Sequence, residues 1–198
     1  MIEHVAVIGG GTMGRGLCWA LAQAGITVTI KELTPIAAQK SLELLEEELD
    51  RQIERWALTN SEKKAILSRI RPTTRLDDLA QASLLIEAVV DHLEQKQEVF
   101  ESLDRHMPPE QIFISNTSSL SITELAECTK RPQKMVGMHF SMPVQERPLV
   151  EIIRGLKTSD ETVAIARELA RAMGKSAIEV FEYPGFVTTR IILPYLNE

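Results

Sequence analysis

Short apolar runs alternate with longer amphipathic stretches along almost the whole chain. The runs are rich in Val and Ile and are bounded by polar residues or glycine, which is typical of strands buried in a sheet. On this pattern we predict strands at residues 4–8, 26–32, 83–90, 111–115, 135–140, 149–153 and 176–181.

The stretches between these strands repeat their apolar residues every three or four positions, as helices that bury one face do. We predict helices from the first glycines to Gly25, over residues 35–56, 61–70, 93–106, 160–173 and 186–196, and a shorter one after residue 122. Ser61 is expected to cap the 61–70 helix. The 35–56 helix is expected to face the core with the stripe Leu42, Leu45, Leu49, Ile53 and Trp56.

Strands that alternate with helices, without an internal repeat or a low-complexity linker, indicate one doubly wound α/β domain with a mostly parallel sheet. The helices at 35–56 and 61–70 make a connection longer than a minimal crossover. We therefore expect a helical insertion after the second strand.

The turn after the first strand has the spacing Gly9-x-Gly11-x-x-Gly14. In a Rossmann-type fold the first glycine makes a tight turn, the second lets a pyrophosphate approach, and the third lets the helix pack on the strand. The helix start, which includes Thr12 and Met13, offers free N–H groups to the phosphates. These five residues are predicted to bind a dinucleotide.

Glu32 ends the second strand, 18 residues after Gly14, close to the separation expected for the acid that accepts ribose hydroxyls. A carboxylate there would repel a 2′-phosphate, so the predicted cofactor is NAD rather than NADP; the alternative is a solvated charge at a strand end. Arg15, in the first helical turn, opposes the helix dipole. It lies either beside bound pyrophosphate or in solvent.

Composition narrows the partners. The 198 residues carry a formal net charge of −6, which argues against nucleic acid, because that affinity rests on neutralised phosphates. No apolar run is long enough for a membrane span, and no basic segment precedes the first strand, so we expect a cytoplasmic protein without a membrane partner. The two cysteines and four histidines lack ligand spacing, so no metal site is expected.

His139 ends one predicted strand, and Glu151 lies in the apolar run of the next. A histidine exchanges protons near neutral pH, and a carboxylate on its other nitrogen would fix the tautomer and stabilise the imidazolium. The pair is a candidate general base; a structural histidine is the alternative. Asp91 follows the strand at 83–90, at the edge where ligands bind in open α/β sheets.

Six segments point to one family when they occur in this order: Ile8–Gly14, Glu87–Asp91, Ser115–Leu120, Gly137–Phe140, Pro148–Ile153 and Pro184–Phe186. Together they closely resemble the NAD-binding domain of the L-3-hydroxyacyl-CoA dehydrogenases, which include 3-hydroxybutyryl-CoA dehydrogenases and multifunctional fatty-acid oxidation enzymes. The resemblance covers essentially the whole chain. It implies an NAD-dependent oxidoreductase that acts on an acyl-CoA thioester.

The resemblance also implies roles for single residues. His139 resembles the general base that takes the proton of the 3-hydroxyl while a hydride passes from C3 to the nicotinamide, giving the 3-ketoacyl thioester. Glu151 resembles its orienting carboxylate, and Ser118 the hydroxyl that contacts the substrate oxygen and the nicotinamide. Asp91 and Lys96 resemble further cofactor contacts.

Other implications concern the rest of the molecule. Arg55 falls near a cationic position that the family uses for CoA. Residues 1–184 resemble the family's NAD-binding domain, and residues 185–198 the start of a linker and helical domain that is otherwise absent here. That helical domain carries most of the family's dimer contact, so a homodimer is expected where it is present, and the helix cut short at the chain end favours a fragment.

Two positions depart from the family pattern. Met142 stands where the family has the asparagine of Phe-Asn-Pro, and Thr189 stands where it has an asparagine before the arginine at Arg190. Each change removes an amide. The alternatives are therefore a dehydrogenase of a free 3-hydroxy acid or an acyl-carrier-protein thioester, and a catalytically degenerate NAD-binding module.

Overall fold

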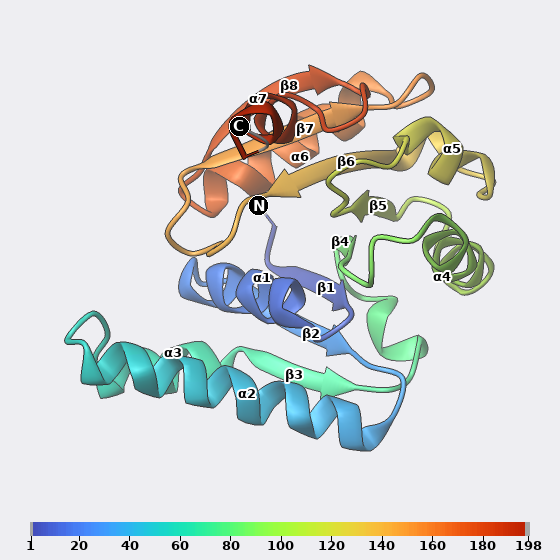
Figure 1. The fold of residues 1–198 in the computed structure, drawn as a ribbon. Helices are drawn as coiled ribbons and strands as arrows, with labels where there is room; N and C mark the ends of the chain where they lie inside the picture. The colour runs from blue at the N-terminus through green and yellow to red at the C-terminus, as the bar shows by residue number, and fades with distance from the viewer. Residues whose placement is uncertain (1, 197–198) are drawn as a thin grey trace.

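The computed structural model describes residues 2–196 and arranges them around one eight-stranded sheet (Figure 1). The strands lie side by side in the order β3-β2-β1-β4-β5-β6-β7-β8. Their bounds are β1 His4–Ile8, β2 Thr27–Lys31, β3 Ile70–Thr73, β4 Leu84–Glu87, β5 Ile112–Ser115, β6 Met135–Phe140, β7 Leu149–Arg154 and β8 Ser176–Phe181.

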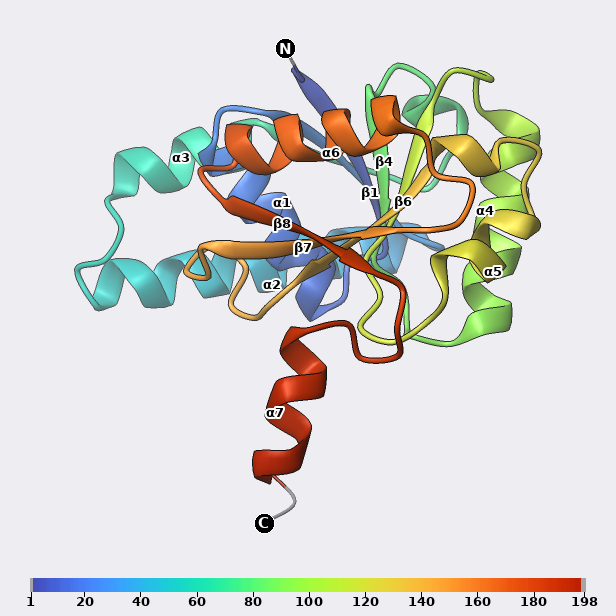
Figure 2. The same cartoon turned by 90° about the horizontal axis from the view of Figure 1, so that it is seen from above.

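The helices connect these strands, and two single 3₁₀ turns occur at Asp77–Leu79 and Pro132–Lys134. The helices are α1 Thr12–Gln23, α2 Pro35–Glu54, α3 Asn60–Ser68, α4 Leu93–His106, α5 Ile122–Glu127, α6 Asp160–Ala172 and α7 Thr188–Leu196. In Figure 2, α7 projects away from the sheet. None of the helices in residues 2–196 combines the length and apolar character needed to cross a bilayer.

Strand direction changes once across the sheet. The strands from β3 to β6 are parallel to their neighbours, whereas β7 is antiparallel to β6 and β8 is parallel to β7. The predicted doubly wound, mostly parallel α/β fold is confirmed, and so is the helical insertion, formed by α2 and α3.

The sheet has a core on each face, because successive side chains of a strand point to opposite sides. Val5 and Val7 point toward the face covered by α1, α2, α3 and α6. Ala6 and Ile8 point toward the face covered by α4 and α5, where Phe100 is fully buried (Figure 2). β1 contributes to both cores and lies between β2 and β4, so the turn that follows it begins at an interior strand of the sheet.

One strand was not predicted from the sequence. β3 pairs with β2 and occupies the sheet edge, although it contains Pro72. Proline is tolerated there because an edge strand does not need every N–H for pairing. The helix predicted at 61–70 is therefore too long: α3 ends at Ser68. It is capped by Thr59, which accepts from the Glu62 N–H, and not by Ser61.

The predicted core stripe of α2 is correct for Leu45 and Leu49 but wrong for Trp56, which is 96% exposed. The helix ends at Glu54, and Trp56 has a φ of +60°, so it has left the helical repeat. A periodic pattern cannot by itself show where a helix stops.

Candidate functional site

The turn between β1 and α1 requires glycine at specific positions. Gly9 has a φ of +99°, which residues with a Cβ rarely adopt. A Cβ on Gly14 would lie 1.8 Å from the Gly9 carbonyl oxygen, so only glycine lets α1 begin this close to β1. Around Gly11 the space is open, with no atom within 4 Å of a Cβ placed there. An anion can therefore approach this backbone and the N–H groups of the helix start.

These two glycines give a matched test. Gly14→Ala is expected to lower the free energy of unfolding by about 1–3 kcal/mol, because the methyl group overlaps backbone that cannot move independently. Gly11→Ala is expected to lower the free energy of unfolding by no more than about 1 kcal/mol, since Gly11 is the N-cap of α1. It is expected to weaken NADH binding about tenfold, which is ~1.4 kcal/mol. Chemical denaturation and calorimetric titration measure the two effects. Equal losses of stability in both variants would contradict this account of the turn.

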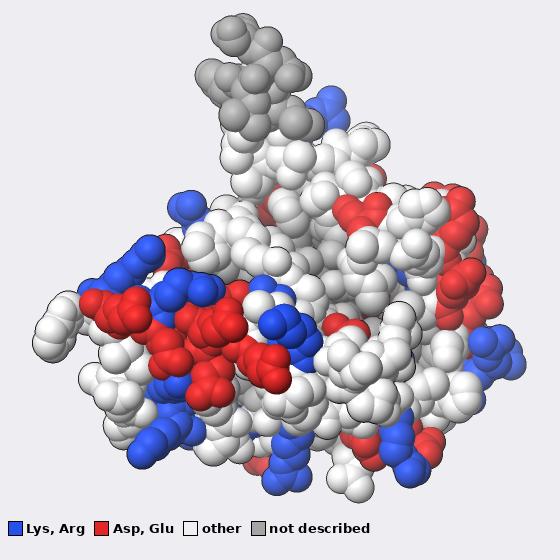
Figure 3. Space-filling model, turned by 60° about the horizontal axis from the view of Figure 1, so that its bottom comes forward, with Lys and Arg blue, Asp and Glu red and all other residues white. Residues whose placement is uncertain are grey.

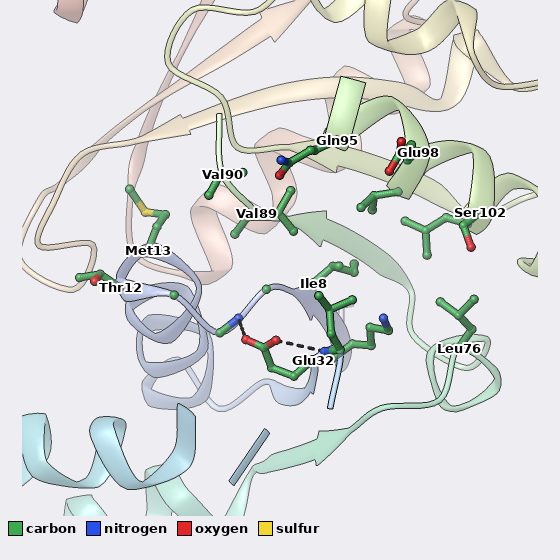
Figure 4. Close-up of a pocket in the computed structure, with 18 residues that line it drawn as sticks. Ile8, Thr12, Met13, Glu32, Leu76, Val89, Val90, Gln95, Glu98 and Ser102 are labelled. Carbon is green, nitrogen blue, oxygen red and sulfur yellow. Dashed lines mark hydrogen bonds between the residues drawn. The ribbon is translucent and has the colours of Figure 1, made fainter. Parts of the chain in front are cut away.

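A cavity of about 790 Å³ opens beside the turn (Figure 4). Glu32, at the end of β2, lies in its wall. The Gly10 N–H donates to Glu32 Oε1 at 2.6 Å, and the Leu33 N–H donates to Oε2 at 3.1 Å. A carboxylate has about four acceptor sites, so capacity for ribose hydroxyls remains. The predicted cofactor residues that line this cavity are Gly9, Gly11, Thr12, Met13 and Glu32.

Hydrogen bonds through Arg15 connect helix α2 to the turn between β1 and α1. Arg15 donates to the Gly10 carbonyl at 3.1 Å and to Glu48 at 2.6 Å. The Ser41 hydroxyl donates to the Ala37 carbonyl of its own helix at 2.9 Å, and its oxygen lies 3.3 Å from the Gly10 carbonyl oxygen. Arg15 is buried, so the alternative that placed it in solvent is wrong, while its place beside bound pyrophosphate stays a prediction. Its charge is paired with Glu48, which offsets the unfavourable placement in the first turn of α1.

Asp91 organises the loop after β5. Thr117 Oγ1 donates to Asp91 Oδ1 at 2.6 Å, while the N–H and the hydroxyl of Ser118 donate to Oδ2 at 3.1 and 3.0 Å. Burial opposes ionisation of Asp91, but these bonds and Lys96 outweigh it and lower its pKa. Asp91 therefore holds both the backbone and the hydroxyl group of Ser118 in place.

Lys96 lies beneath this loop and has no exposed surface. Its ammonium donates to both carboxylate oxygens of Glu87, at 2.6 and 2.8 Å, and lies 3.7 Å from Asp91. Burial raises the pKa of Glu87, and Lys96 opposes that rise. Ser115 Oγ also donates to Glu87. In this conformation Lys96 ties the ends of β4 and β5 to α4; its predicted contact with the cofactor stays a prediction.

His139 and Glu151 are direct partners in the antiparallel register of β6 and β7. His139 Nδ1 donates to Glu151 Oε2 at 2.7 Å, since an ionised carboxylate can only accept. The Nε2 lone pair is then available to a substrate. The His139 side chain retains 12% of its exposure, whereas that of Glu151 retains 2%.

The Glu151 carboxylate is held in place on both oxygens. Oε1 accepts from the N–H groups of Val187 at 2.9 Å and Thr188 at 3.0 Å. Burial opposes its ionisation, but the hydrogen bonds from His139, Thr188 and Val187 outweigh burial, so the pKa of Glu151 lies below its ordinary value. Asn116 Oδ1 accepts from the Phe140 N–H at 3.3 Å, which joins the Ser118 loop to the strand end that carries His139.

This arrangement matches a known family. The family model described as "3-hydroxyacyl-CoA dehydrogenase, NAD binding domain" covers residues 4–183. The chain belongs to this family. It is an NAD-dependent oxidoreductase, and the glycine turn with its open face at Gly11 fits that cofactor.

Relatives of this dehydrogenase family span both short and long proteins. A probable 3-hydroxybutyryl-CoA dehydrogenase of Bacillus subtilis is 44% identical over 197 residues, which are 100% of this chain and 69% of that protein. A fatty acid oxidation complex subunit alpha of Psychrobacter arcticus is 38% identical, covering 99% of this chain but 27% of its own length. The crystal structure of (S)-3-hydroxybutyryl-CoA dehydrogenase from Ralstonia eutropha superposes with a TM-score of 0.95 at 40% identity, covering 100% of this chain and 70% of that one.

Neither of the two positions that depart from the dehydrogenase pattern lines the cavity beside the glycine turn. Met142 is 43% exposed and lines a second cavity, of about 180 Å³, together with Trp19 and Arg51. Thr189 lies in the first turn of α7, next to the residues that hold Glu151. Arg55 is exposed at the C-cap of α2, so its role toward CoA stays a prediction.

Glu87 and Asn116 were not singled out from the sequence. Glu87 had a usable signal, because it is a lone acid in an apolar strand, as Glu151 is, and such an acid needs a buried partner. Asn116 had none, since a polar residue after a strand is most often part of a turn. Among residues 2–196, no cluster of three or more His, Cys, Asp or Glu side chains could hold a metal ion.

Proposed function

We propose that this chain interconverts an L-3-hydroxyacyl-CoA and its 3-ketoacyl-CoA, with His139 as the general base and Glu151 as its orienting carboxylate. The relatives named 3-hydroxybutyryl-CoA dehydrogenase supply the substrate class. The observation that carries the chemistry is the 2.7 Å contact between His139 Nδ1 and Glu151 Oε2, which leaves the Nε2 atom of a partly exposed side chain for the substrate.

In the oxidation direction, the 3-hydroxyl gives its proton to His139 Nε2 as its oxygen forms a double bond to C3. The electron pair of the C3–H bond leaves as hydride, for which bound NAD supplies the acceptor. The imidazolium then faces the Glu151 carboxylate, which stabilises its charge. The reverse direction returns the proton from Nε2 to the oxygen.

Ser118 is proposed to contact the same substrate oxygen. Its hydroxyl, which donates to Asp91 in the structure, can turn its proton to the substrate oxygen, because a hydroxyl rotates to suit its partner. That bond would leave the single proton of the 3-hydroxyl directed at His139 Nε2. Asp91 and the hydrogen bond between Asn116 and Phe140 support both residues on one rigid edge of the sheet.

The direct test follows the loss of NADH absorbance with acetoacetyl-CoA as substrate. Turnover that free CoA inhibits competitively is expected. Turnover that free CoA does not inhibit would favour a free 3-hydroxy acid or an acyl-carrier-protein thioester instead.

A second candidate function is a non-catalytic NAD-binding module. Met142 favours it, because a thioether offers no strong hydrogen bond at a position where the family pattern has an amide. Calorimetric binding of NADH without turnover of any thioester would support this second function and overturn the first.

Cofactor choice is proposed to rest on Glu32. Glu32→Ala is expected to raise the KM for NAD about tenfold to a hundredfold, since one charged hydrogen-bond partner is worth ~1.5–3 kcal/mol. The variant is also expected to prefer NAD over NADP by a smaller factor, because the carboxylate that repels a 2′-phosphate is gone. The control is Glu43→Ala, an exposed acid on α2. Steady-state kinetics with both cofactors measure the ratio. An unchanged ratio in Glu32→Ala would assign the selectivity to other residues.

A further inference from the structure

The Glu151 carboxylate divides its two oxygens between different elements. Oε2 faces His139 on β6, and Oε1 accepts from two consecutive N–H groups at the start of α7. Helix starts have N–H groups without partners in the helix, and the dipole there favours negative charge. Glu151 therefore serves α7 and His139 at the same time.

The turn that leads into α7 is constrained. Gly185 has a φ of +78° and Phe186 a φ of +48°; the second is uncommon for a residue with a bulky side chain. Phe186 is nevertheless only 3% exposed, and its ring centroid lies 5.8 Å from that of His139. The Phe186 N–H donates to the Tyr183 carbonyl, and the Arg190 N–H donates to the Gly185 carbonyl. Conformations of this kind persist where surrounding contacts over-determine them.

Two kinds of contact from this turn reach the His139–Glu151 pair. The Phe186 ring packs beside the imidazole, and the next two N–H groups bind the carboxylate that orients it. Because both contacts come from consecutive residues, a displacement of α7 would disturb both together. α7 meanwhile projects from the sheet and exposes Ile191 and Ile192 (Figure 2).

We propose that residues 186–188 are a positioning element for the His139–Glu151 pair: the Phe186 ring and the amides of Val187 and Thr188 fix the carboxylate so that one oxygen faces Nδ1. This inference rests on the proposed function for its catalytic consequence, but its geometric part does not. Efficient proton transfer then depends on α7 staying in place.

Thr188→Pro removes one of the two amide donors with little harm to the helix. Thr188 is the first helical residue, where proline is well tolerated because its ring sets a suitable φ. Val187, which precedes it, lies outside the helix, so the restriction that proline imposes on its neighbour can be met. Thr188→Ala is the matched control, since it keeps both amides and removes only the side chain.

Two measurements compare these variants. Carbon-13 NMR of the glutamate carboxyls is expected to show a higher pKa for Glu151 in Thr188→Pro than in Thr188→Ala, because one bond to the ionised form is lost. With acetoacetyl-CoA and NADH, kcat is expected to be about tenfold lower in Thr188→Pro than in Thr188→Ala, or ~1.4 kcal/mol, with similar KM.

The outcomes separate the two proposals. If Glu151 titrates alike in the two variants and kcat is equal, the positioning role is wrong, whatever the activity. If Glu151 shifts as expected while the unmodified protein turns over no thioester, the proposed function fails and the geometric role stands. Should Thr188→Pro not fold, replacing Thr188 by its α-hydroxy acid analogue removes the same N–H as an ester and is measured identically.

Discussion

His139→Ala is expected to lower kcat by roughly 10²–10⁴-fold, the range for loss of a positioned general base. NADH binding should change little, because His139 does not line the cavity beside the glycine turn. Glu151→Gln is expected to lower kcat less, because its one amide oxygen can still accept from Nδ1, although its NH2 group then opposes the Val187 and Thr188 N–H groups and the neutral amide does not stabilise the imidazolium. The measurement is NADH consumption with acetoacetyl-CoA, beside calorimetric NADH titration.

The control is His106→Ala. His106 lies at the exposed end of α4, where its Nδ1 contacts the Ser102 carbonyl. The His106→Ala variant should consume NADH at the rate of the unmodified protein. Equal rates for His139→Ala and His106→Ala would remove His139 from the mechanism.

Lys96→Met is expected to lower the free energy of unfolding by about 3–5 kcal/mol, the typical cost of leaving one member of a buried ion pair alone. The reason is that Glu87 is fully buried and receives the Lys96 ammonium on both oxygens. The double variant Lys96→Met, Glu87→Gln should recover part of the loss, since the neutral amide still accepts from the Val89 N–H.

The loss of unfolding free energy in Lys96→Met should depend on pH. Burial raises the pKa of Glu87 and Lys96 opposes that rise, so the variant raises it further. A carboxyl group with a raised pKa in the folded state binds a proton more readily there than in the unfolded chain. The stability that the protonated carboxyl contributes is fully present below its unfolded pKa of about 4.3. That stability is lost as the pH increases through the pKa of the folded state. Denaturation at pH 4.5 and 8 should therefore show the smaller deficit at pH 4.5; a deficit independent of pH would contradict this explanation.

The sequence was most informative where local chemistry dictates structure. Gly9, Gly11 and Gly14 are singled out by spacing, and their positions require a positive φ, an open face or a close approach. The alternation of apolar runs likewise predicted seven of the strands; β3 escaped notice because Arg71 and Pro72 break its pattern at an exposed edge.

The site was less predictable, because its contacts join residues far apart in the chain. The role of Arg15 depends on Glu48, which α2 brings alongside, and the fixation of Glu151 depends on amides that carry no side-chain signature. The roles assigned to the site residues, the boundary after residue 184 and the homodimer stay predictions.

The register of β6 and β7 makes the contact between His139 and Glu151 sensitive to changes within the strands but not to changes in the loop between them. His139 faces Glu151 because the two are directly opposite in an antiparallel ladder, and slipping that ladder by one residue would turn the carboxylate to the other face of the sheet. The connection between the strands, residues 141–148, takes no part in the pairing. Insertions there leave the His139–Glu151 contact intact, whereas a single insertion within either strand breaks it. The loop that carries Met142 can therefore change in length and sequence without separating His139 from Glu151.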